Sequence, residues 1–113
     1  MIHRIAVAST DGENIDLHFA KAFQFYIFDV VDEQEYTFVE VRENPNAVRH
    51  GEIEFQKIIA TLQDCSAIVV SQIGYGAAKY IFSTGIRVFE APYPISAVLH
   101  KFAVKQILSQ VAD

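Results

Sequence analysis

The side chains best suited to binding chemistry begin in a polar stretch that follows a short apolar run at residues 5–8. They supply hydroxyl, carboxylate, amide and imidazole groups: Ser9, Thr10, Asp11, Asn14 and His18. A neutral imidazole can ligate iron, copper or molybdenum, so His18 is the candidate metal ligand. A loop histidine that only hydrogen-bonds to backbone is an equally open interpretation. The stretch is a candidate binding loop, because long polar connections between strands usually carry function.

Two further segments offer groups that could hold an anion. Arg42, Arg49 and His50 supply positive charge or hydrogen-bond donors. The turn at Gly74 and Gly76 offers backbone amides at the start of an expected helix. This glycine pair lacks the third glycine and the downstream acidic residue of a dinucleotide-binding motif, so it is weak as a phosphate motif. A strand-to-helix turn that requires close approach is the ordinary explanation for it.

The elements that must position these groups follow from the hydrophobic pattern. Apolar runs and alternation predict strands at 5–8, 23–30, 36–42, 67–70 and 86–90. Apolar stripes at helical spacing predict helices at 52–63, at 77–83 and from Pro94 to about Val111. The short polar link at 32–34 can join only antiparallel neighbours, and right-handed crossovers make the last two strands parallel. The pattern predicts one α/β domain over 1–113, with a mixed five-stranded sheet flanked by helices in the order βββαβαβα.

Strand direction predicts where the candidate residues meet. If all strands but the second run the same way, the loops at 9–19, 43–51, 72–76 and 91–94 leave from one edge of the sheet. Open α/β sheets bind ligands at the carboxyl ends of their parallel strands. Cys65 precedes the strand at 67–70, so we expect it at the opposite edge as a small buried residue. The core is predicted to contain Ile5, Val7, Phe25, Ile58, Leu62, Ile68, Val70, Ile81, Val88, Leu99 and Phe102.

Composition narrows the classes of function. The 113 residues are 51% hydrophobic and 20% charged, which is typical of one folded domain. The formal net charge of −5 makes nucleic acid a poor partner. A single cysteine excludes an internal disulfide and an all-cysteine metal cage. The sequence shows neither a signal peptide nor a membrane span, so we expect a cytoplasmic location.

Several stretches in a fixed order extend over almost the whole chain: Ala8-Ser9-Thr10-Asp11-Gly12, Ile15-Asp16-x-His18-Phe19, Phe25–Val30, Leu62–Val70, Ile73-Gly74-Tyr75-Gly76-Ala77 and Gly85-Ile86-Arg87-Val88. Together they resemble the dinitrogenase iron–molybdenum cofactor biosynthesis family, which includes NifX, NifY-type proteins and the C-terminal part of NifB. The usual His-Phe-Gly of that family is His18-Phe19-Ala20 here. The resemblance implies a ribonuclease H-like motif.

The resemblance also implies a function in nitrogen fixation. A protein of this kind would be a non-enzymatic carrier of the iron–molybdenum cofactor or of a precursor iron–sulfur cluster, loosely bound. Its partners would be the cluster and the proteins that donate or accept it. A regulatory or protein-interaction module that has lost cluster binding is the alternative. A ribonuclease H-like nuclease is disfavoured, because the strand at 5–8 has no carboxylate to hold magnesium ions.

Overall fold

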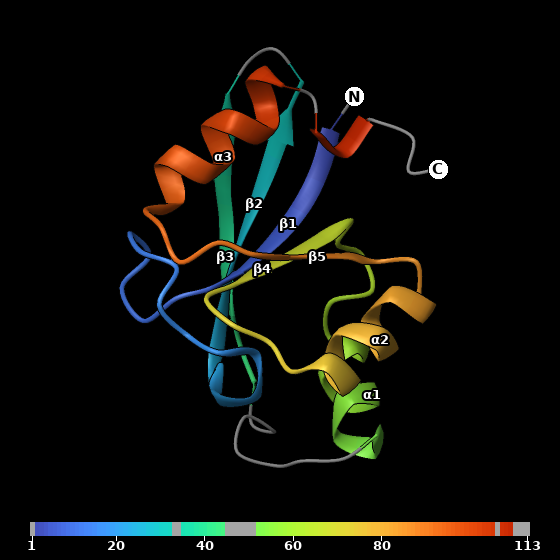
Figure 1. Ribbon diagram of the computed structural model, residues 1–113. Helices are drawn as coiled ribbons and strands as arrows, with labels where there is room; N and C mark the ends of the chain where they lie inside the picture. The colour runs from blue at the N-terminus through green and yellow to red at the C-terminus, as the bar shows by residue number, and fades with distance from the viewer. Residues whose placement is uncertain (1, 33–34, 45–51, 106, 110–113) are drawn as a thin grey trace.

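The apolar runs form a five-stranded sheet in a computed structural model that describes residues 2–32, 35–44, 52–105 and 107–109 (Figure 1). The strands are β1 (Ile2–Ala8), β2 (Gln24–Val31), β3 (Tyr36–Glu43), β4 (Ala67–Val70) and β5 (Arg87–Glu90). The helices are α1 (Glu52–Ala60), α2 (Tyr75–Ser83) and α3 (Ile95–Val104), with 3₁₀ turns η1 (Phe19–Lys21) and η2 (Ile107–Ser109). This order confirms the predicted βββαβαβα arrangement.

The sheet is mixed, as predicted. Its spatial order is β3-β2-β1-β4-β5. Strand β2 is antiparallel to β1 and β3, whereas β4 is parallel to β1 and β5. It follows that β1, β3, β4 and β5 run the same way, and the segments after them leave from one edge of the sheet. That edge is the expected location of a ligand site.

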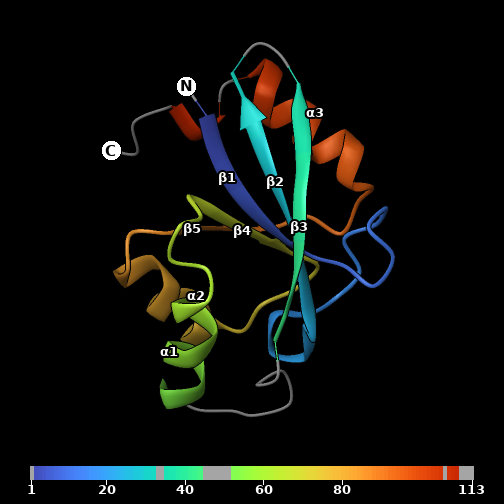
Figure 2. The same ribbon diagram turned by 180° about the vertical axis from the view of Figure 1, so that it is seen from behind.

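Helices cover both faces of the sheet. On one face, Ile27 and Ile68 belong to a buried cluster with Ile81 of α2. On the other face, Val7 belongs to a second cluster with Leu99 of α3. Figures 1 and 2 show α1 and α2 together at one end of the molecule, well separated from α3. The two layers arise because successive side chains of a strand point to opposite faces.

The predicted core is confirmed. Of its members, Val88 alone is half-buried, and it packs against the α1–α2 cluster. The others are buried: Ile5, Val7, Phe25, Ile58, Leu62, Ile68, Val70, Ile81, Leu99 and Phe102. Within the described ranges, no helix has the length and apolar character needed to cross a bilayer.

Two helices are shorter than their apolar stripes predict. Helix α1 ends at Ala60, and the buried Leu62 lies in a turn whose amide donates to the Ile59 carbonyl at 2.9 Å. Helix α3 ends at Val104, and η2 follows it. A turn can continue the apolar spacing of a helix, so the stripe does not reveal where the helix ends. Val111, which the prediction also placed in the last helix, lies outside the described residues.

Candidate functional site

Three loops meet at the predicted edge of the sheet. The loop after β1 forms an isolated bridge from Asn14 to Pro94, which follows β5, and another from His18 to Gln72, which follows β4. The Ile95 amide donates to the Glu13 carbonyl at 2.8 Å and strengthens the first junction. The convergence predicted from strand direction is therefore present for the loops after β1, β4 and β5. Arg49 and His50, predicted to join them from the loop after β3, lie outside the described residues.

The polar groups at the start of the first loop hold the loop itself in shape. Ser9 is fully buried, and its hydroxyl accepts from the Gly12 amide at 2.9 Å and donates to the Asp11 carboxylate at 3.2 Å. The same carboxylate accepts from the Asn14 amide at 3.0 Å and from the Glu13 amide at 2.8 Å. These two amides hold the pKa of the Asp11 carboxyl below its usual value. Ser9 and Asp11 thus act first as loop organisers.

Thr10 and Asn14 are also part of this internal network. The Thr10 amide donates to Asp16 at 2.9 Å, and the Thr10 hydroxyl donates to the other oxygen of that carboxylate. The Asn14 side-chain amide reaches Asp11 at 3.5 Å. These hydrogen bonds order the loop without any ligand, and in general a loop that is already ordered pays a smaller entropy cost on binding.

His18 is exposed, as are Thr10, Asp11 and Asn14. The Phe19 amide donates to the Gln72 carbonyl at 2.9 Å, and Phe19 is only 1% exposed, so the backbone beside His18 is anchored. The His18 carbonyl accepts from the Lys21 amide at 3.0 Å and closes η1. A hollow of about 140 Å³ lies beside this turn, lined by His18, Ala20, Gln72, Ile73 and Gly74.

Ala20, which stands where the related family has glycine, lies inside η1. A 3₁₀ turn uses backbone angles that any L residue adopts, so this conformation does not require glycine. The alanine methyl group contributes to the wall of the hollow instead.

The start of helix α2 also lines this hollow. Gly74 is its N-cap and, being glycine, has no side chain that could accept from the first helix amides. The Gly74 carbonyl accepts from the Ala78 amide at 3.0 Å. The first amides of a helix have no partner within the helix and carry its positive dipole end. A Cβ at Gly74 or Gly76 would meet nothing within 4 Å. The expectation that these glycines permit close packing of the chain was wrong, because the turn faces open space.

The Arg42 guanidinium does not join the residues around His18, so the prediction that it belongs to the binding edge was wrong. Its guanidinium makes two hydrogen bonds of 2.7 Å to Asp64 and one of 2.9 Å to the Thr61 carbonyl. A bidentate arginine–carboxylate pair is strong and directional, and it draws the side chain toward the end of α1. The Arg42 guanidinium, with help from Arg4, holds the pKa of the Asp64 carboxyl well below its usual range.

Cys65 is buried at the far end of β4, as predicted, with 4% of its surface exposed. Burial, together with the neighbouring Asp64 charge, raises the pKa of its thiol to about 12. His3 is buried and lies 3.4 Å from Asp32, and His100 is exposed on α3. These placements agree with the expectation that neither histidine belongs to the binding edge.

Iodoacetamide should scarcely modify Cys65 in the folded protein. Only the thiolate reacts, and at pH 8 a pKa near 12 leaves a thiolate fraction roughly a thousandfold smaller than that of an ordinary cysteine. Mass spectrometry of timed samples, with and without urea, gives the two rates. Rapid modification in buffer, at a rate close to that in urea, would contradict the buried placement.

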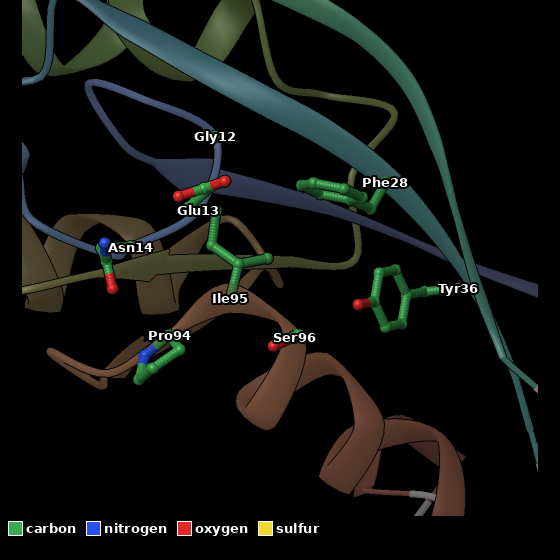
Figure 3. Close-up of a pocket in the computed structure, with 8 residues that line it drawn as sticks. All are labelled: Gly12, Glu13, Asn14, Phe28, Tyr36, Pro94, Ile95 and Ser96. Carbon is green, nitrogen blue, oxygen red and sulfur yellow. The ribbon is translucent and has the colours of Figure 1, made fainter.

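A second, larger hollow of about 420 Å³ lies away from His18, between the first loop and the start of α3. Figure 3 shows Tyr36 on one side of it and Asn14 with Pro94 on the other. Phe28 packs edge-on against Tyr36 with ring centroids 5.9 Å apart. Sequence reasoning missed this hollow, because its walls come from strands and loops far apart in the chain.

Among the residues that the structure describes, no three His, Cys, Asp or Glu side chains gather in a way suited to a metal ion. Sequence reasoning placed the loop at 72–76 at this edge but did not single out Gln72 and Ile73, which line the hollow with His18. Neither side chain has a distinctive chemistry, so only the structure shows that Gln72 is bridged to His18 and that both residues line the hollow.

Comparison with known proteins identifies the family. The family model described as dinitrogenase iron–molybdenum cofactor matches residues 1–105. NifX of Rhodobacter capsulatus is 31% identical over 109 residues, which cover 89% of this chain and 68% of NifX. The FeMo cofactor biosynthesis protein NifB of Chlorobaculum tepidum is 31% identical over 85 residues, 74% of this chain but only 20% of NifB. The crystal structure of PH0822 has a TM-score of 0.67 and 27% identity, covering 88% of this chain and 89% of that one. The chain belongs to the dinitrogenase iron–molybdenum cofactor family.

Proposed function

We propose that this protein is a non-enzymatic carrier in iron–molybdenum cofactor biosynthesis. Its cargo would be the iron–molybdenum cofactor or a precursor iron–sulfur cluster, received from one protein and passed to another. Family membership supports the pathway, and the names of the NifX and NifB relatives point to the same process. The finer assignment, a carrier with its site at His18, rests on the geometry of the edge.

The observation that carries the proposal is that an exposed histidine and a helix start without a side-chain cap line the same small hollow. Both His18 and Gly74, the N-cap of α2, line this hollow. An imidazole nitrogen can ligate a metal atom of the cluster, while helix amides stabilise its anionic sulfur and oxygen groups. The two kinds of group complement a metal–sulfur anion.

The surroundings of His18 favour a cargo that can leave again. The hollow is small and the side chain is exposed, so a cluster bound there keeps most of its surface outside the protein. A single replaceable imidazole is easier to exchange than several thiolates, and Cys65 is buried elsewhere. A carrier needs this combination, since it must release what it binds.

His18→Ala should lower the affinity for isolated iron–molybdenum cofactor by about tenfold or more, on the order of 1.4 kcal/mol. The variant loses the metal ligand but no buried contact, so its melting temperature should stay near that of the wild type. Anaerobic titration followed by visible absorbance measures the affinity. His100→Ala removes another exposed histidine, which lies on α3, and is the matched control. Wild-type affinity in His18→Ala would remove the histidine from the site.

A protein-interaction module without cargo is the second candidate. Tyr75 is 83% exposed and Phe82 is 79% exposed, and both lie on α2 at a spacing of seven residues. Residues at this spacing share one face of a helix, and exposed aromatic side chains are common in protein interfaces. The same titration separates the candidates, because a module without cargo would show no binding in the wild type.

A further inference from the structure

Glu90, the last residue of β5, is an unexpected neighbour for a site that binds an anion. Its carboxylate accepts a hydrogen bond from the Ile73 amide at 2.8 Å. Ile73 lines the hollow and directly precedes Gly74, the N-cap of α2. A negative charge here opposes the binding of an anionic ligand, so its presence calls for a role other than contact with that ligand.

The hydrogen bond from Ile73 continues into the backbone pairing that holds His18. The Gln72 carbonyl accepts from the Phe19 amide at 2.9 Å. On the other side of His18, the Leu17 carbonyl accepts from the Ser71 amide at 3.0 Å. The two strands of backbone, 17–19 and 71–73, therefore lie side by side, and Glu90 holds the end of the second one.

We propose that Glu90 is a positioning residue for this site. It fixes the turn at 72–74, and through that turn it sets the orientation of His18 toward the start of α2. The nature of the ligand rests on the proposed function, whereas the positioning itself is a property of the protein without cargo. The residues that line the hollow belong to the segments after β1 and β4, whereas Glu90 ends β5, so its hydrogen bond to the Ile73 amide joins β5 to those two segments.

Two substitutions separate the hydrogen bond from the charge. Glu90→Gln keeps a side-chain oxygen that can accept from the Ile73 amide but removes the negative charge. Glu90→Ala removes both. If Glu90 acts by positioning, the two variants change cargo affinity in opposite directions, because the glutamine retains the turn and relieves the repulsion. A residue that acts through charge alone would make both variants bind more tightly.

The experiment has a part without cargo and a part with it. In the cargo-free protein, amide hydrogen exchange at Ile73 should be about tenfold faster in Glu90→Ala than in the wild type, and unchanged in Glu90→Gln. The NMR signal of the His18 ring should shift in Glu90→Ala alone. Glu13→Ala, which removes another exposed carboxylate from the same edge, should change neither reading.

Titration with isolated iron–molybdenum cofactor gives the second reading. Affinity should fall about tenfold in Glu90→Ala and rise about two- to fivefold in Glu90→Gln, and the gain should shrink as salt is added. Unchanged Ile73 exchange and an unchanged His18 signal in Glu90→Ala would overturn the positioning role. So would wild-type or tighter cargo binding by Glu90→Ala. Absence of binding by the wild type would instead overturn the proposed function, and the cargo-free readings would then decide the role of Glu90 by themselves.

Discussion

Val70→Asp should leave the protein without a cooperative folding transition. Val70 is fully buried on β4, and β4 pairs with β1 on one side and β5 on the other. A carboxylate at this position has no solvent and no charged partner, so it would be buried at a cost of several kcal/mol. A domain of this size has only about 5–15 kcal/mol of stability, which such a change largely removes.

Circular dichroism during heating tests this expectation, and Val41→Asp is the matched control. Val41→Asp is the same substitution on edge strand β3. Val41 is 42% exposed there, so the new carboxylate can remain in water. This variant should melt cooperatively, close to the wild type. A soluble Val70→Asp protein with a sharp melting transition would show that β4 does not occupy the centre of the fold.

Gly12→Ala should destabilise the protein by about 2–4 kcal/mol, because it combines backbone strain with a steric clash. Gly12 has φ of 76°, a left-handed conformation that L residues adopt at a cost. A Cβ there would lie 2.6 Å from Cε2 of Tyr26. That ring packs against Phe38 with centroids 6.1 Å apart, so it cannot move aside freely.

Gly85→Ala separates the two contributions. Gly85 also has a left-handed conformation, with φ of 88°, but a Cβ there would meet nothing within 4 Å. It should therefore cost only about 1–2 kcal/mol, the backbone contribution alone. Urea unfolding of both variants gives the difference. In a Tyr26→Ala background, the loss of unfolding free energy caused by Gly12→Ala should fall to the value for Gly85→Ala. An unchanged loss in that background would rule out the clash with the ring.

The order of the elements was predictable from local pattern. Short apolar runs such as 67–70 and alternation such as that of 36–42 report burial directly, and the brief link at 32–34 allows only an antiparallel pair. These features depend on neighbours in the sequence, so no tertiary information was needed to predict the mixed sheet or the edge where its loops meet.

The roles of individual polar residues depended on distant contacts. Arg42 was expected at the binding edge, yet Asp64, which lies 22 residues later, draws its guanidinium away. Ser9 and Asp11 looked like ligand-binding groups, and the structure shows them bonded to the amides of their own loop. A side chain's type sets which bonds it can make, but only the folded backbone decides which partner is within reach.

The sequence by itself determined the composition of the core, the succession of strands and helices, and the place of His18 on a loop at one edge of the sheet. Only the tertiary structure decided that Gln72, Ile73 and the start of α2 line the same hollow as this histidine, and that the Glu90 carboxylate accepts a hydrogen bond from the Ile73 amide. The physical reason is one of range. Hydrophobic periodicity acts over a few residues, whereas the hollow is assembled from segments that meet only when β1, β4 and β5 pair side by side.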